Sequence, residues 1–178
     1  MKKILAAIAL GLSVSLVSFT AAAHGPSPLK VDKSITIKAD PAKVWALIKD
    51  FGNMQKWNPA IVSSKLEKKG ADTFRTLTLK EGGTSHDKLR STDDADMKIK
   101  YETVTSDLPL TDYNAFIVVT KGEKPGETNV QWVSRFYRLY KLNPPIPAGQ
   151  DDETALKAIN GIIDTGLAGL QKTAESAK

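Results

Sequence analysis

The sequence contains no cysteine and only two histidines, His24 and His86, among its 178 residues. The absence of cysteine excludes disulfides, thiolate metal sites and cysteine nucleophiles. Two histidines leave little material for a histidine-rich metal centre or a Ser-His-Asp triad. The acidic turn at 93–96 lacks the rest of a calcium-binding loop. We therefore expect no metal and no cofactor, and the composition favours a binding or accessory protein.

A strong excess of one charge is also lacking, because 25 Lys and Arg residues stand against 20 Asp and Glu residues, which gives a net charge of +5. The densest basic stretch, from Lys65 to Lys69, is interrupted by Leu66 and Glu67. So weak and scattered a positive charge does not favour nucleic-acid binding. Hydrophobic residues make up 41% of the chain, which predicts one globular domain with a sizeable core.

The amino terminus carries the longest uncharged run of the sequence. Two lysines precede a mostly apolar stretch from Ile4 to Thr20, which is followed by three alanines at 21–23. This arrangement is typical of a secretory signal peptide, residues 1–23, cleaved after Ala23. We expect a mature chain that begins at His24 in the bacterial periplasm, or outside the cell, with no stable membrane anchor. An uncleaved anchor is the alternative, because the run is almost long enough to span a bilayer.

Strand and turn signals dominate the middle of the chain. Residues 24–29 form a turn-rich lead-in, and a single domain is expected over 30–178. Alternating apolar and polar residues predict a first strand over 31–38 and six more strands near 60–68, 73–80, 84–91, 97–105, 112–121 and 128–140. The turns between these six are short and rich in Gly, Asp and Pro, so the strands are expected to form one strongly curved antiparallel sheet.

Helical signals follow the first strand and close the chain. Asp40 as an N-cap and Pro41 at the first helical position predict a short helix over 40–50, with one more turn at 54–57. After the acidic residues 151–153, apolar residues at helical spacing predict a long amphipathic helix. Gly161, Gly166 and Gly169 are costly inside a helix, which predicts close approach of the sheet or room for a cavity there.

This order of elements, with the motifs SITIxADPxxVW at 34–45 and DFGxMxxWNP at 50–59, resembles the START-like helix-grip superfamily, which includes polyketide cyclase-like proteins. The resemblance implies an α+β fold in which a seven-stranded curved antiparallel sheet wraps around the long C-terminal helix and encloses a pocket. Together with the leader and the ending AINGIIDTGL at 158–167, the chain is most similar to the MxaD type of periplasmic accessory protein. That likeness implies a methanol dehydrogenase and a c-type cytochrome as partners.

Strand alternation identifies the side chains that would face the pocket. In the last strand, Val130, Trp132, Ser134 and Phe136 share one face, and the same reasoning places Tyr101, Tyr113 and Arg75 inward from their strands. The predicted ligand-pocket residues are therefore Trp57, Arg75, Tyr101, Tyr113, Trp132, Phe136 and Gly161. A plain alternative is that the aromatic side chains only fill the core.

Three of these positions leave a choice open. Arg75 either presents its guanidinium to an acidic ligand or pairs with a carboxylate of the protein. Trp57, held by the following Asn-Pro pair, either covers the mouth of the pocket or plugs the space between the short helices and the sheet. His86 and Asp87 are neighbours on one strand and point to opposite faces, so they are not expected to form an acid/base dyad.

Two classes of function follow. The preferred one is a non-enzymatic accessory protein of methanol oxidation, as the resemblance implies. The other is a carrier of a hydrophobic small molecule or a polyketide cyclase-like pocket enzyme, in which Arg75, Tyr101 or Tyr113 would orient the ligand and assist proton transfer. The sequence offers no identifiable set of nucleophile, base and orienting group, which weighs against catalysis.

Overall fold

A computed structural model describes residues 25–176, so the predicted leader and the new amino terminus at His24 lie outside the described residues. Seven strands form one antiparallel sheet in the order β1-β7-β6-β5-β4-β3-β2. Their bounds are β1 (Leu29–Ile37), β2 (Ile61–Lys69), β3 (Asp72–Leu79), β4 (Thr84–Asp93), β5 (Lys98–Ser106), β6 (Leu110–Lys121) and β7 (Thr128–Arg138). Three helical segments complete the fold: α1 (Pro41–Lys49), the 3-10 turn η1 (Met54–Lys56) and α2 (Asp152–Ser176).

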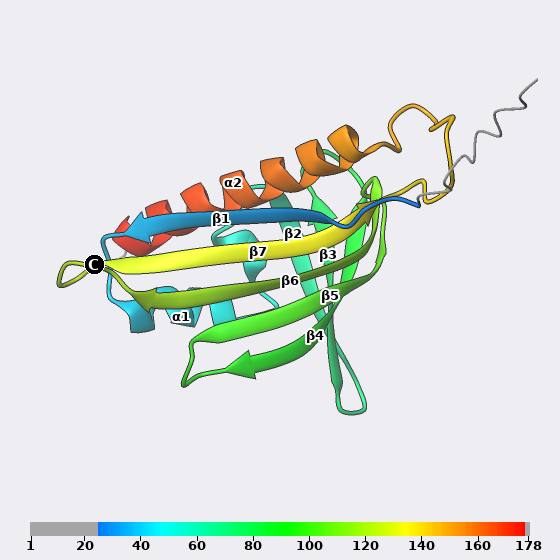
Figure 1. The fold of residues 1–178 in the computed structure, drawn as a ribbon. Coiled ribbons are helices and arrows are strands. Elements are labelled where there is room, and N and C mark those ends of the chain that lie inside the picture. Colours follow the sequence, from blue (N-terminus) through cyan, green and yellow to red (C-terminus); the bar gives the residue numbers. More distant parts are fainter. Residues whose placement is uncertain (1–24, 177–178) are drawn as a thin grey trace, which may run out of the picture.

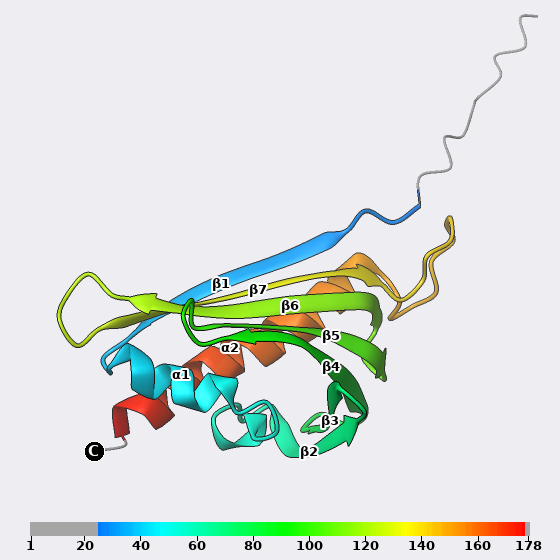
Figure 2. The ribbon, with the colours of Figure 1, turned by 90° about the horizontal axis from the view of Figure 1, so that it is seen from below.

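The sheet bends around α2, which lies along its concave face (Figures 1 and 2). Four breaks in strand register let it bend, at Ile61/Ser63 in β2, His86/Asp87 and Leu89/Ser91 in β4, and Thr111/Asn114 in β6. Such β-bulges kink a strand and increase its twist. The predicted helix-grip fold, with seven antiparallel strands around a long C-terminal helix, is confirmed.

The short helix α1 forms where the cap signals predict it. The Asp40 carboxylate accepts a hydrogen bond of 2.8 Å from the backbone nitrogen of Ala42. The buried face of α1 carries Trp45, whose Nε1 donates to the Asp94 carboxylate at 2.7 Å. This bond fastens the β4–β5 turn to the helix, which gives that acidic turn a structural role.

The long helix α2 turns one apolar face to the sheet, as its spacing predicts. Its buried residues are Ala155, Ile159, Ile163, Gly166, Leu167, Leu170 and Ala174. Gly166 lies against the side chains of Asn58 and Trp132, and Gly169 lies against Trp57 and Pro59, so close packing at these two glycines is confirmed. Within residues 25–176, no helix has the length and apolar character needed to cross a membrane.

At Gly161 the second alternative, room for a cavity, is the one observed, because this glycine has no close packing and borders a hollow. Gly161 is exposed, and a Cβ atom placed there would have no neighbour within 4 Å. The physical reason is helix phase: Gly161 follows the buried Ile159 by two positions, which turns it about 200° away from the buried face. Gly161 therefore faces solvent, on the side of α2 that does not pack against the sheet.

Candidate functional site

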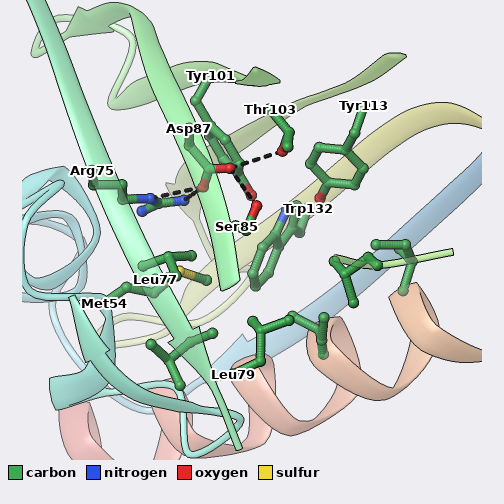
Figure 3. Close-up of a pocket in the computed structure, with 14 residues that line it drawn as sticks. Met54, Arg75, Leu77, Leu79, Ser85, Asp87, Tyr101, Thr103, Tyr113 and Trp132 are labelled. Atoms are coloured by element: carbon green, nitrogen blue, oxygen red, sulfur yellow. Dashed lines mark hydrogen bonds and ion pairs between the residues drawn. The ribbon is translucent and has the colours of Figure 1, made fainter. Parts of the chain in front are cut away.

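A small cavity lies between the concave face of the sheet and α2 (Figure 3), with a volume of about 30 Å³. Each strand from β3 to β7 contributes a side chain to its wall, because inward positions alternate along every strand. The strand residues that line it are Ile61 of β2 together with Arg75, Leu77, Leu79, Ser85, Asp87, Tyr101, Thr103, Tyr113 and Trp132. Ile159 and Ile162 of α2 close the helix side.

A buried ion pair forms one end of this cavity. Arg75 Nε donates to Asp87 Oδ2 at 3.0 Å, and Arg75 Nη2 lies 3.0 Å from the same oxygen. The two side chains are only 5% and 3% exposed. The guanidinium also stands over the rings of Phe51 and Tyr101, at 4.1 and 4.7 Å from their centroids. Of the two alternatives for Arg75, pairing with a carboxylate of the protein is the one observed.

The second oxygen of Asp87 is also engaged. Asp87 Oδ1 accepts hydrogen bonds from Ser85 Oγ at 2.9 Å and from Thr103 Oγ1 at 2.8 Å. Figure 3 shows these side chains converging from β3, β4 and β5. Arg75, Asp87, Ser85 and Thr103 therefore form a closed polar network with no net charge, which is the form in which a buried ion pair is tolerated.

Aromatic side chains form the opposite end of the cavity. Tyr113 stacks on Phe136 with 6.0 Å between ring centroids, and its hydroxyl points toward Trp132 (Figure 3). Trp132 is 1% exposed, and its Nε1 makes no hydrogen bond of normal length among the described residues, although its N–H is near enough to the Tyr101 hydroxyl to lower the pKa of that group. A buried N–H without an acceptor is rare in folded proteins. This end of the cavity therefore has an unused hydrogen-bond donor.

A much larger hollow of about 670 Å³ opens on the outer side of the cavity. It lies between α2, the β3–β4 turn and the β5–β6 turn, and its floor includes Gly161 and Ala158 of α2. Leu79, Leu108 and Ile162 line both the hollow and the inner cavity. These three side chains therefore lie between the narrow inner cavity, which holds the Arg75–Asp87 pair, and the wide, mostly apolar hollow.

Comparison with known proteins assigns the chain to a family. The model of the family described as "Polyketide cyclase / dehydrase and lipid transport" matches residues 28–175. The chain belongs to this family. No protein with a curated description matches the chain.

Solved structures agree with this family assignment. The protein XoxI from Bacillus cereus is 28% identical, with a TM-score of 0.71 over 83% of this chain and 96% of that one. An uncharacterised protein from Bacillus thuringiensis is also 28% identical, with a TM-score of 0.69 over 81% of this chain and 97% of its own. A START superfamily protein from Mycobacterium smegmatis, at 15% identity and a TM-score of 0.64 over 84% and 99% of the two chains, shares the fold.

In this polyketide cyclase family member, four of the seven predicted pocket residues meet at the inner cavity, namely Arg75, Tyr101, Tyr113 and Trp132. Phe136 lies behind Tyr113, outside the cavity wall. Trp57 is 3% exposed and packs edge-on against Trp132 at 5.9 Å, so it plugs the core and does not cover a mouth. Gly161 borders the outer hollow.

Residue-level reasoning missed Ser85, Asp87 and Thr103 as part of the polar network. It considered Asp87 only as a neighbour of His86, and these two do point apart as expected. His86 lies on the convex face, where its ring stacks on Phe74 at 5.3 Å. The predicted β3–β4 hairpin could have identified Asp87. In an antiparallel pair joined by the turn at 81–83, Arg75 on one strand lies directly opposite Asp87 on the other.

Burial changes the acidity of the two cavity tyrosines. It raises the pKa of Tyr101 to about 12, although the guanidinium of Arg75 acts in the opposite direction. Burial also raises the pKa of Tyr113 well above its ordinary value, and the neighbouring Tyr101 adds to this effect. Both hydroxyls therefore stay protonated, and able to donate, across the physiological pH range.

These pKa values predict a loss of stability at high pH. The folded protein keeps protons on Tyr101 and Tyr113 where an unfolded chain has already released them, so the free energy of unfolding should fall as the pH rises from about 10 toward 12. In an alkaline titration followed by phenolate absorbance, these two of the four tyrosines should ionise last, together with unfolding. Tyr101→Phe should remove part of that late step. Early ionisation of all four tyrosines in the folded protein would contradict the prediction.

Proposed function

We propose that this protein is a non-enzymatic periplasmic accessory protein of methanol oxidation, which assists a methanol dehydrogenase and its contact with a c-type cytochrome. The observation that carries the non-enzymatic part is the closed Arg75–Asp87 network. Among residues 25–176, the only carboxylate on the cavity wall is held by Arg75, Ser85 and Thr103, so it is not free to take a proton from a substrate. The tyrosines, with raised pKa values, are poor bases near neutral pH.

The size of the cavity supports the same proposal. A volume of about 30 Å³ is roughly a tenth of the smallest usual small-molecule pocket, so a polyketide-sized substrate does not reach the inner polar groups without a rearrangement. The partners come from the resemblance of the sequence to MxaD-type proteins, and the location comes from the leader at 1–23.

Export makes a simple prediction about the mature chain. If the leader is cleaved after Ala23, the intact mass of the exported protein should correspond to a chain that begins at His24, and the protein should fractionate with the periplasm. A mass that retains residues 1–23, found in the membrane fraction, would overturn the periplasmic part of the proposal.

The β2–β3 hairpin is the surface we propose for contact with an acidic partner. It projects beyond the rest of the sheet (Figure 1), and Lys65, Lys68 and Lys69 are exposed along it. Lys69 is near Glu67, at 3.4 Å, but both side chains are about half exposed, so this pair neutralises the local charge only weakly. Exposed charges of this kind mainly change the rate at which partners associate.

Charge reversal on the hairpin should therefore slow association. In an assay of electron transfer from a methanol dehydrogenase to its cytochrome, the protein should raise the rate, and the double variant Lys68→Glu/Lys69→Glu should reduce that stimulation several-fold. Added salt should act in the same direction. Lys121→Glu/Lys124→Glu, at the β6–β7 turn, is the matched control and should have little effect. No stimulation by the unmodified protein would end the proposal.

A second candidate function is a carrier of a small apolar molecule, and one observation favours it. The outer hollow of about 670 Å³ is within the size range of ligand pockets and adjoins the inner cavity at Leu79, Leu108 and Ile162. A carrier needs a pocket but no catalytic group, so this candidate is also consistent with the closed ion pair.

A further inference from the structure

The unused donor in the inner cavity is Trp132 Nε1. The Trp132 side chain is 1% exposed and lines the cavity, and among residues 25–176 its N–H makes no hydrogen bond of normal length; the hydroxyl of Tyr101 is near but too far or too poorly aligned to satisfy it. An indole N–H can only donate, so the group it lacks is a hydrogen-bond acceptor. The cavity of about 30 Å³ offers room for one oxygen atom of the size of a water or a carbonyl group.

The charges around the cavity decide which kind of oxygen fits. Asp87 is compensated by Arg75, and both of its oxygens already accept hydrogen bonds. A carboxylate placed in the cavity would add a second negative charge close to Asp87, and the described residues that line the cavity include no cation besides Arg75 to offset it. An ammonium group would lie beside the Arg75 guanidinium and would find no free carboxylate. The site is therefore suited to a neutral acceptor.

The entrance decides what the oxygen is attached to. Leu79, Leu108 and Ile162 stand between the cavity and the outer hollow, so a molecule whose oxygen reaches Trp132 must displace these three aliphatic side chains. Beyond them, the hollow is bordered by Pro59, Pro109 and Ala158, with Lys80 and Lys157 among its polar residues. An apolar chain or ring would bury its surface there.

We infer that the cavity and the hollow form one site for a neutral apolar molecule with a single carbonyl oxygen, and that Trp132 Nε1 donates a hydrogen bond to that oxygen. The Tyr113 hydroxyl also lines the cavity and points toward Trp132 (Figure 3), but it interacts with Tyr101, which leaves Trp132 as the donor for the ligand. This inference rests on the carrier function, and it adds the chemical class of the ligand and the residue that selects it.

The test compares three probes of equal chain length: 2-octanone, octanoate and octylammonium. Each is titrated into the exported protein while the indole N–H signals of the tryptophans are followed by ¹H–¹⁵N NMR. The Trp132 signal is assigned from its loss in Trp132→Phe. We expect 2-octanone to bind at least tenfold more tightly than either charged probe and to move the Trp132 signal downfield.

Two variants separate selection from stability. Trp132→Phe keeps an aromatic ring but removes the donor, and it should weaken binding of 2-octanone by about fivefold to tenfold. Trp45→Phe is the control, because Trp45 is also buried but donates to Asp94, away from the cavity; it should leave the affinity unchanged. If Trp132→Phe does not fold, the movement of the Trp132 signal in the unmodified protein still decides the question.

The possible outcomes distinguish this inference from the carrier function. If octanoate or octylammonium binds as tightly as 2-octanone, or if 2-octanone binds without moving the Trp132 signal, the carrier function stands and the inference is wrong. If none of the three probes binds, the inference is overturned and the carrier function loses its support as well.

Discussion

Gly169→Ala should destabilise the protein by about 3 kcal/mol or more, because a methyl group at this position has no space. A Cβ atom there would lie 2.2 Å from the carbonyl oxygen of Trp57 and 2.4 Å from Cδ of Pro59. The first is backbone and the second belongs to a rigid ring, so α2 itself would have to move away from the 57–59 segment. Equilibrium unfolding in urea measures the effect.

Gly161→Ala on the same helix is the matched control, and it should have the opposite sign. Gly161 has open space around its Cα, so the substitution only gains helix propensity and should stabilise the protein by up to about 1 kcal/mol. If the free energies of unfolding of the two variants differed by less than about 1 kcal/mol, α2 would not be in close contact with the 57–59 segment.

Asp87→Ala should be the other severe substitution, with a loss of about 3–5 kcal/mol. The variant leaves the Arg75 guanidinium buried without its carboxylate, and the hydroxyls of Ser85 and Thr103 lose their acceptor. Arg75→Met alone should also be costly, because it leaves a buried carboxylate. That single variant therefore cannot serve as a mild probe of the pocket. Thermal and urea unfolding of both variants measure these losses.

The double variant Arg75→Met/Asp87→Leu provides the control. It removes both charges and fills the space with apolar groups, so it should recover most of the stability lost by either single change. If the double variant were as unstable as the sum of the two single variants, the ion pair would not be the reason for their instability.

The period of the apolar residues was enough to predict the elements and most of their order. Strand alternation brought Arg75, Tyr101, Tyr113 and Trp132 to the inner face, because inward and outward positions alternate whatever the tertiary detail. Asp87 was missed because its partner lies across a hairpin, and only the register of β3 and β4 places it beside Arg75. Long-range pairing of this kind is not visible in the residues next to Asp87.

Other parts of the site depend on packing that the sequence pattern does not specify. The sequence pattern does not distinguish the three glycines of α2, but of these three only Gly166 and Gly169 pack against the 57–59 segment. The division of the pocket into a cavity of about 30 Å³ and a hollow of about 670 Å³ depends on how Leu79, Leu108 and Ile162 pack together. Local periodicity indicates that these residues are apolar and turn inward, but not how much space they leave.

The central claim, that the protein assists a partner without chemistry in its cavity, is tested most directly by the Arg75→Met/Asp87→Leu variant in the electron-transfer assay. The variant removes every formal charge from the inner cavity while the β2–β3 hairpin stays unchanged. With its fold verified by unfolding and NMR, we expect it to stimulate electron transfer from methanol dehydrogenase to the cytochrome as well as the unmodified protein does. Loss of stimulation in the folded double variant would contradict the account and would place the activity in the cavity.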